Sequence, residues 1–468
     1  MPNNVGLPPI GAVLQSVDGE RIKILGKLGD GGQGVVYKVD YSGKPKALKW
    51  YYQNAFDVCQ KDLSGEYVRD MHGQKICDQA ATENAKRMFY ENLKNNIAHG
   101  APCDEFLWPQ DITPMVNDSF GYIMDIRPPE YQELSILLIG RKASFASFQA
   151  RIDGMLNLVN AFRVFHNKGY NYQDLNDGNF FFNPETGAVL ICDNDNAAYQ
   201  GYNTGIVGKC RFMAPEVVLG QKMPDTMTDR FSMAVILFFM LFRSHPLEGA
   251  EGTPACMTPS VEKYVYGSHP VFVFDPDDRS NRPVRGVADH SSAVWDTIPQ
   301  YVKDAFIRSF SKGCMEYSSS AQKYGAARLT DKEWIDTLMR FRNEPVLCAK
   351  YPQCKGEVFY SKNNSVCPRC KTPLPIAGKI QLPKYQMVLH SRTVLYKAQV
   401  GSAGDAEALE PVGKVMVRNG QCGLVNVSGD KWLCAGPSGT VHELPAGAGF
   451  LIAPNTRVQL PTGKFELV

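Results

Sequence analysis

Two predicted strands near the start of the chain are joined by a glycine-rich turn, "LGDGGQGVV". The strands are "RIKILGKL" (21–28) and "VVYKVDY" (35–41), and the turn carries Gly29, Gly31 and Gly34 in a G-x-G-x-x-G-x-V pattern. Glycines in such a turn let the backbone approach a phosphate closely and direct N–H groups towards it. A dinucleotide-binding fold would need a helix directly after the glycines, whereas a strand follows here, which argues against that fold. A flexible hairpin without a ligand remains the alternative.

A lone lysine, Lys49, lies among apolar residues in the next predicted strand, "KALKWYY". A strand lysine usually extends its ammonium group to solvent along apolar neighbours. After a glycine-rich hairpin, Lys49 could instead reach the α- and β-phosphates of a nucleotide, held by a glutamate on a following helix. The stretch 81–100 has good helix formers and ends at a glycine, so it is predicted to be that helix. It offers Glu91 as the first candidate and Glu83 as the second.

Farther along, the stretch "GYNYQDLNDGNFFF" (169–182) places Asp174, Asn176, Asp177 and Asn179 between apolar flanks. Asn, Asp and Gly are ordinary turn formers, so one interpretation is a simple loop. The other interpretation is that Asp174 and Asn179 take part in chemistry. The motifs before and after this stretch favour the second.

In their order along the chain, these features resemble the eukaryotic-like (bacterial-type) serine/threonine protein kinase family over residues 18–345. The further motifs are "YIMDIRP", "ICDNDNA", "FMAPE", "TDRFSMAVILFF" and "ARLTDKEW". The resemblance implies a multidomain α+β chain with a bilobal kinase fold: an N-terminal arm at 1–17, an N-lobe at 18–127 and a C-lobe at 128–345. It also implies transfer of the γ-phosphoryl group of ATP to Ser or Thr hydroxyls of a protein, including this chain itself.

The resemblance also implies a nucleotide site in the N-lobe. Met124 would be the gatekeeper, and the backbone of Asp125 and Arg127 would face the adenine. The residues implied to bind ATP are Gly29, Gly31, Gly34, Val36, Ala47, Lys49, Met124, Asp125, Arg127 and Phe181.

For the reaction, the resemblance assigns Asp174 as the base that orients the acceptor hydroxyl, with Lys49 and Glu91 as a catalytic ion pair. It assigns Asn179 and Asp193 as ligands of Mg²⁺ (or Mn²⁺). Oxygen ligands of this kind suit a hard cation that bridges phosphates.

Several positions depart from the family pattern. Tyr172 and Gln173 replace the His and Arg before the catalytic Asp, and Asn176 stands where protein-serine/threonine kinases carry a Lys. Asn194 replaces the Phe of D-F-G, and Lys209 replaces a Thr ahead of "APE". These changes leave two rivals open: a pseudokinase scaffold, and a small-molecule kinase. The retained residues Ala214, Pro215, Glu216, Asp229 and Arg328 argue against the second, because the family builds its protein-substrate platform with them.

Four of the 13 cysteines form a C-x5-C-x12-C-x2-C pattern: Cys348, Cys354, Cys367 and Cys370. Four thiolates can form a closed tetrahedral Zn²⁺ site, and the segment is poor in the apolar residues that would fold it otherwise. A structural zinc ribbon at 346–377 is predicted, against the alternative of unconnected cysteines. The other cysteines are predicted to be free thiols in a reducing compartment.

The C-terminal stretch 383–468 alternates apolar and polar residues between Gly/Pro turns, which predicts a small β-sandwich or barrel. Its final half resembles the forkhead-associated (FHA) fold, with an oligonucleotide-binding (OB) type barrel as the competing assignment. We expect it to dock a partner.

The overall composition sets limits on partners and location. A net charge of +2 gives no electrostatic reason to expect nucleic acid or a membrane surface as partner. The N-terminus lacks the pattern of a secretory signal, and the most apolar window, "MAVILFFMLF", is too short to span a bilayer. A cytoplasmic protein is expected. The resemblance implies a protein substrate, together with a type 2C phosphatase and a von Willebrand A-type protein as partners.

Overall fold

The computed structural model describes residues 6–62, 66–199, 208–254, 256–315, 328–361, 364–436 and 438–468. The chain divides into two compact units. The first unit comprises residues 1–144, 157–293 and 306–331, and the second comprises 145–156, 294–305 and 332–468.

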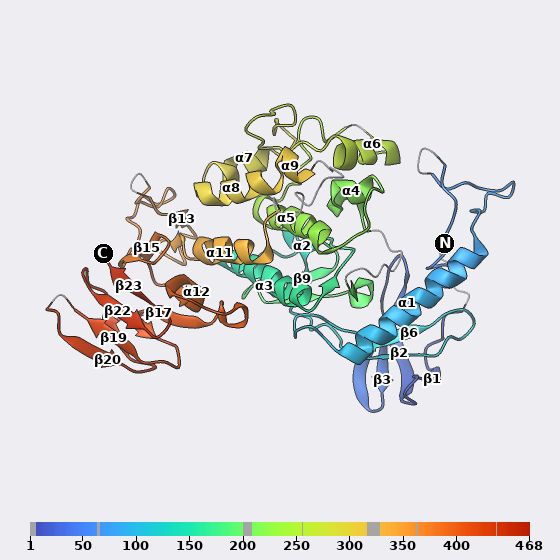
Figure 1. The fold of residues 1–468 in the computed structure, drawn as a ribbon, viewed down its shortest axis with the longest axis horizontal. Helices are drawn as coiled ribbons and strands as arrows, with labels where there is room; N and C mark the ends of the chain where they lie inside the picture. Colours follow the sequence, from blue (N-terminus) through green and yellow to red (C-terminus); the bar gives the residue numbers. More distant parts are fainter. Residues whose placement is uncertain are drawn as a thin grey trace. The chain divides into compact units, whose positions relative to one another are not determined.

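The N-terminal part of the first unit is an antiparallel sheet with one long helix, α1 (Gln79–His99), against it (Figure 1). A two-residue turn joins β3 (Gly34–Tyr41) to β4 (Lys44–Tyr51), and both of its residues, Ser42 and Gly43, have positive φ, as a tight hairpin turn requires. The strand order is β1-β2-β3-β4-β6-β5. The strands are β1 (Val13–Gln15), β2 (Arg21–Asp30), β3 (Gly34–Tyr41), β4 (Lys44–Tyr51), β5 (Asp111–Ile112) and β6 (Gly121–Met124).

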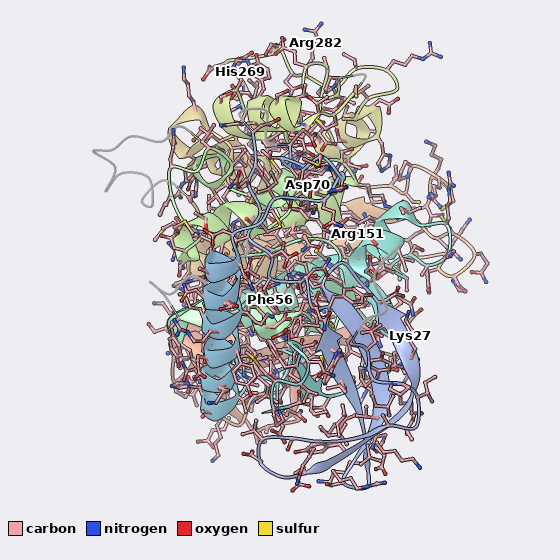
Figure 2. The ribbon with its side chains drawn as sticks, turned by 90° about the vertical axis from the view of Figure 1, so that its right-hand side faces the viewer. Lys27, Phe56, Asp70, Arg151, His269 and Arg282 are labelled. Atoms are coloured by element: carbon pink, nitrogen blue, oxygen red, sulfur yellow. A yellow bond between two sulfur atoms is a disulfide. The ribbon has the colours of Figure 1, made fainter. Side chains whose placement is uncertain are left out.

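The two faces of this sheet bury separate apolar clusters, because side chains alternate along each strand. One cluster contains Val35, Leu48 and Trp50. The other contains Ala47, Tyr51, Tyr122 and Met124 together with Phe89 and Leu93 of α1. Phe56, which is labelled in Figure 2, follows β4 in sequence, and its ring centroid lies 5.0 Å from that of Phe89.

After the sheet, helices dominate, with short strands between them. Most residues of helix α5 (Thr226–Phe242) are buried, and its N-terminus is closed by a capping box between Asp225 and Thr228. The apolar run Met233–Phe242 lies inside this helix and is buried along its whole length. The elements from residue 132 to 315 are β7 (Gln132–Glu133), α2 (Leu134–Ile139), α3 (Phe148–Asn167), β8 (Tyr170–Asn171), β9 (Phe180–Phe182), β10 (Val189–Ile191), η1 (Asn194–Asn196), β11 (Ala198–Tyr199), η2 (Cys210–Phe212), α4 (Pro215–Val218), α5 (Thr226–Phe242), α6 (Pro259–Lys263), η3 (Tyr264–Ser268), α7 (Asp289–Trp295), α8 (Gln300–Ser309) and α9 (Lys312–Met315).

The second unit contains a short hairpin and two antiparallel sheets. The sheets have the strand orders β15-β14-β23-β22-β19-β20 and β16-β17-β18-β21, and their residues share one apolar core around Trp432. A core filled from two sheets is the arrangement of a β-sandwich. The elements are α11 (Asp331–Arg342), β12 (Pro345–Leu347), β13 (Glu357–Phe359), β14 (Gly378–Gln381), β15 (Gln386–Leu389), β16 (Val394–Tyr396), α12 (Lys397–Val400), η4 (Asp405–Glu407), β17 (Pro411–Arg418), β18 (Gln421–Asn426), β19 (Trp432–Ala435), β20 (Val441–Leu444), β21 (Gly449–Leu451), β22 (Arg457–Leu460) and β23 (Gly463–Leu467).

The predicted strands of the N-terminal sheet and the helix at 81–100 are confirmed, with ends shifted by a few residues. One expectation about the cysteines is wrong: Cys59 and Cys77 form a disulfide rather than free thiols. They face each other across an isolated β-bridge, a pairing between loop residues that sequence spacing does not predict. Among the described helices, none combines the length and the apolar character needed to cross a membrane.

Candidate active site

The sheet presents several of the predicted nucleotide-binding residues on one face. Ala47 and Lys49 are two residues apart on β4, so their side chains lie on the same face. They pair in register with Met124 and Tyr122 of β6. Val36 of β3, the strand on the opposite edge of β4 from β6, pairs with Lys49 and packs against the apolar cluster that contains Ala47 and Met124. The structure therefore brings these residues together on one face of the sheet, where most of them are buried.

The residues that follow β6 are held by side-chain contacts. The carboxylate of Asp125 accepts hydrogen bonds from Lys46 and from Gln110. The guanidinium group of Arg127 lies over the ring of Phe181, 4.2 Å from its centroid. Arg127 and Phe181 are thus neighbours, as a shared adenine site would require.

Of the three glycines in the G-x-G-x-x-G pattern of the turn, packing requires one and does not require the other two. A Cβ on Gly34 would lie 2.2 Å from the carbonyl oxygen of Trp50, so only glycine fits there. A Cβ on Gly29 or Gly31 would meet nothing within 4 Å. At those two positions the backbone faces open space, which leaves room for a ligand.

Lys49 is buried and lies between two carboxylates of the "DND" segment. Its ammonium Nζ is 2.7 Å from Oδ2 of Asp195 and 3.4 Å from Oδ1 of Asp193. Although burial opposes its charged form, these carboxylates raise the pKa of Lys49 well above its usual value. Lys49 therefore stays charged, and it is brought to Asp193, a predicted metal ligand 144 residues away in sequence.

The predicted ion pair between Lys49 and Glu91 is not formed. Glu91 is exposed on α1 and pairs with Lys94 at 3.6 Å, and Glu83 is exposed as well. The physical reason is the helix register: α1 turns Phe89, Asn92, Leu93 and Asn96 inward. Asp195 holds Lys49 instead. The sequence did not predict Asp195 as the partner of Lys49, because the family resemblance placed that partner on the helix rather than beside Asp193.

Asp174 lies in the loop between β8 and β9, and its carboxylate is held in place. Its Oδ1 accepts hydrogen bonds from Nδ2 of Asn176 at 3.0 Å and from the backbone N–H of Lys209 at 3.3 Å. Burial raises the pKa of Asp174, although the hydrogen bond from Asn176 opposes that change. A raised pKa makes the carboxylate a better proton acceptor near neutral pH.

The same loop is linked to the predicted metal ligands. Nδ2 of Asn179 donates to the backbone carbonyl of Asp174 at 3.0 Å, and the carbonyl of Asn179 accepts from N–H of Cys192 at 2.9 Å. Asp193, which follows Cys192 in sequence, is in the left-handed conformation with φ 53°. Asp174, Asn179 and Asp193 are therefore neighbours.

Tyr172 takes over packing and hydrogen bonding where the family pattern has a His. Its ring is fully buried, and its hydroxyl donates to the carbonyls of Cys192 and Asp193. Its backbone N–H donates to Oδ2 of Asp229 at 2.7 Å. Tyr172 thus connects the loop of Asp174 to the segment of Asp193 and to helix α5.

Lys209 lies beside the loop of Asp174, at a position not predicted to be functional. Its ammonium Nζ donates to Oδ1 of Asn176 at 2.9 Å and is 3.9 Å from a carboxylate oxygen of Asp177. The positive charge missing at position 176 is thus present next to it. The departures at 176 and 209 were both visible in the sequence, and only their proximity was not.

A buried ion pair fixes the segment that follows. Arg328 Nη1 and Nη2 bind Oε1 and Oε2 of Glu216 at 2.8 and 2.9 Å. Arg328 also donates to the carbonyls of Met227 and Cys314, both at 2.9 Å. The "APE" helix α4 is therefore anchored to α5 and α9 by one guanidinium group.

In the second unit, the four predicted metal-ligating cysteines come together. The Sγ atoms of Cys348 and Cys370 are 3.4 Å apart, those of Cys354 and Cys367 are 3.6 Å apart, and all four lie within 4.8 Å of one another. A tetrahedral site with Zn–S bonds of about 2.3 Å needs sulfur separations of roughly 3.8 Å. The four sulfur atoms are therefore close enough together to coordinate one zinc ion.

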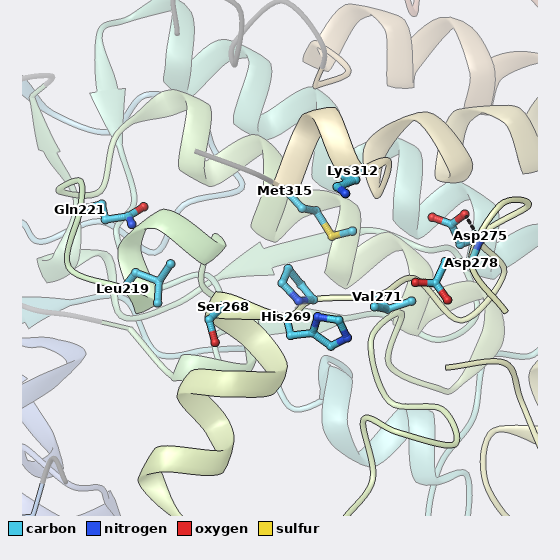
Figure 3. A pocket seen from close by; sticks show the side chains of 11 residues that line it. Leu219, Gln221, Ser268, His269, Val271, Asp275, Asp278, Lys312 and Met315 are labelled. Atoms are coloured by element: carbon cyan, nitrogen blue, oxygen red, sulfur yellow. Dashed lines mark hydrogen bonds between the residues drawn. The ribbon is translucent and has the colours of Figure 1, made fainter. Parts of the chain in front are cut away.

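A separate cavity of about 450 Å³ lies in the first unit, between the end of α4, η3, the loop after it, and α9 (Figure 3). Its lining mixes charges of both signs, with Asp275, Asp278 and Lys312, and includes His269. Among the described residues that line it, none is predicted to bind ATP or metal.

Residues 115–323 match a family model described as a protein kinase domain. The matched stretch contains Asp174, Asn179 and Asp193 and begins after the glycine-rich turn and Lys49. No curated protein matches the chain. The match supports a protein kinase domain, and with it a transferase that uses ATP.

Proposed function

We propose that this protein is an ATP- and Mg²⁺-dependent serine/threonine protein kinase, with itself among its substrates. The observation that carries the proposal is the approach of Lys49 to Asp193. The two residues come from strand β4 and from the turn after β10, and their side chains lie 3.4 Å apart. A lysine for nucleotide phosphates and a carboxylate for the metal must lie side by side in a phosphoryl-transfer site.

In the proposed reaction, Lys49 binds the α- and β-phosphates, and the glycine-rich turn covers them. Asp174 orients the hydroxyl group of the acceptor and takes its proton. The hydroxyl oxygen forms a bond to the γ-phosphorus, the bond to the oxygen that bridges to the β-phosphate breaks, and ADP leaves. Most of the catalysis is then positioning and charge neutralisation.

Asn179 and Asp193 would hold the metal ion. Both offer oxygen ligands, and the hydrogen bond between Asn179 and Cys192 keeps them adjacent, which suits Mg²⁺. When bound, the ion would neutralise charge on the phosphates. The half-exposed carboxylate of Asp193 is open to such an ion.

Two observations argue against the alternative functions, a small-molecule kinase and a pseudokinase scaffold. The Glu216–Arg328 pair supports a platform for protein substrates rather than a small-molecule kinase. Lys209 next to Asn176 supports activity over a pseudokinase scaffold, since it replaces the charge that the loop lacks.

For the other parts of the chain, we propose a kinase domain at 18–345, a structural zinc ribbon at 346–377 and an FHA-like or OB-like β-domain at 383–468. The cluster of four sulfurs supports the zinc site. A docking role for the β-domain, partnership with a type 2C phosphatase and a von Willebrand A-type protein, and a cytoplasmic location stay predictions.

The test is to incubate the purified chain with γ-labelled ATP and Mg²⁺, alone and with one acidic and one basic acceptor protein. We expect acid-stable label in protein, and phosphoserine or phosphothreonine after hydrolysis. Label only in small molecules would favour the small-molecule kinase. Nucleotide binding without any transfer would favour the scaffold and overturn the proposal.

A further inference from the structure

The two carboxylates beside Lys49 differ in their surroundings. The side chain of Asp193 is 46% exposed, whereas that of Asp195 is fully buried. The shorter contact, 2.7 Å, is to the buried carboxylate. Asp193 is thus open to a ligand or metal ion, while Asp195 is enclosed with Lys49.

Asp195 is itself fixed by a second donor. The hydroxyl of Tyr51, two residues after Lys49 on β4, donates to the same Oδ2 atom. Lys49 and Tyr51 point to the same face of the strand because side chains alternate. One strand therefore supplies both a charged and a neutral donor to one carboxylate oxygen.

Helix α1 contacts the same segment through neutral groups. Nδ2 of Asn92 and Nδ2 of Asn96 both donate to the carbonyl of Ala197, at 2.9 and 2.8 Å. The two asparagines lie four residues apart, on one face of the helix. Glu91 lies on another face and is paired with Lys94.

We propose that Asp195 is the positioning residue of Lys49, and that α1 acts on the site through its neutral contacts, including its hydrogen bonds to the Asp195 segment, rather than through an ion pair with Lys49. This inference rests on the proposed function, since Lys49 is assigned there to the phosphates of ATP. Asp195 touches neither substrate nor metal ion in this account. It fixes the lysine, and the same turn that carries it also carries Asp193.

This arrangement has a direct consequence for which part of the chain assembles the site. Lysine positioning and the metal ligand Asp193 are built on one short segment, 193–197, rather than divided between a helix and a turn. Loss of charge on α1 should therefore leave nucleotide binding unchanged. Loss of charge at 195 should weaken it.

The experiment compares Asp195→Asn with Glu91→Gln, in the full chain, by equilibrium binding of Mg·ATP and by kcat and KM for ATP. We expect Asp195→Asn to raise the Kd and KM for ATP at least about tenfold, the cost of a lost charge-assisted hydrogen bond. KM for the acceptor protein should not change. Glu91→Gln should stay within about twofold of wild type, since an exposed pair contributes little.

A merely structural role of Asp195 is distinguished by adding Lys49→Met. In that background Asp195→Asn should cause little further loss of Mg·ATP binding, because its effect acts through the lysine. Equal loss with and without Lys49 would overturn the proposal, and so would a loss in Glu91→Gln as large as in Asp195→Asn.

If Asp195→Asn does not fold, Tyr51→Phe keeps the carboxylate and removes its neutral donor. We then expect a severalfold rise in KM for ATP, in line with one lost hydrogen bond, and an unchanged KM would overturn the proposal. A wild-type protein that binds no Mg·ATP would refute the proposed function instead, so the two failures are distinct.

Discussion

Replacing Arg328 by methionine should destabilise the first unit by about 3–5 kcal/mol, because it leaves a buried carboxylate without its charged partner. The side chains of Arg328 and Glu216 are only 2% and 1% exposed, so water cannot replace the lost guanidinium group. The carbonyls of Met227 and Cys314 lose a donor as well. Methionine fills much of the same volume, so the cost reflects charge rather than a cavity.

The assay is equilibrium unfolding in urea, followed by tryptophan fluorescence and circular dichroism, with the transition of the first unit fitted separately. Asp30→Asn is the control, because it breaks the exposed ion pair with Lys27 and should cost less than about 1 kcal/mol. The double variant Glu216→Leu/Arg328→Met should cost less than the sum of the two single variants. Strict additivity, or a loss below about 1 kcal/mol for Arg328→Met, would refute the reasoning.

Further predictions concern the metal site, the loop lysine and a buried histidine. Protein purified without chelator should contain one tightly bound zinc ion per chain by elemental analysis, and Cys367→Ser should lose it while the first unit still unfolds at the same urea concentration; zinc-free wild type would contradict the site. Lys209→Ala should lower kcat for transfer at least about tenfold, the effect of one lost charge-assisted contact, and Asn176→Lys added to it should restore most of the rate; no rescue would mean that the charge near 176 is not needed. Although burial opposes its charged form, carboxylates including that of Asp331 raise the pKa of His166 from 6.5 to about 9. The stability from this charged group is therefore complete below pH 6.5 and is lost as the pH rises through 9, so the difference in unfolding free energy between wild type and His166→Asn should shrink by up to about 3 kcal/mol over that range. A difference that does not depend on pH would contradict this.

Much of the N-terminal sheet was open to prediction, because its signals are local. Alternating side chains and glycine-rich turns mark β2, β3 and β4, and the helix formers of 81–100 mark α1. The cysteine spacing likewise predicted a cluster that the structure forms. In each case the determinant lies within a few tens of residues.

The details that sequence could not supply depend on which face an element turns inward. Whether Glu91 or Asn92 faces the site is decided by packing of Phe89 and Leu93 in the core, not by helix propensity. In the same way, Lys209 and Asn176 are 33 residues apart, and their contact arises from tertiary structure. The Cys59–Cys77 disulfide is a third case of such a contact.

The most direct test of the central claim is a single-turnover measurement of label transfer from Mg·ATP to protein by wild type, Asp174→Asn and Asp177→Asn. Asp177 is in the same loop and serves as a matched control. We expect Asp174→Asn to slow transfer at least about 100-fold, the usual contribution of a general base. Its Kd for Mg·ATP should stay near the wild-type value, because Asp174 would contact the acceptor hydroxyl rather than the nucleotide. Asp177→Asn should transfer at close to the wild-type rate. Equal transfer by Asp174→Asn and wild type would contradict the account.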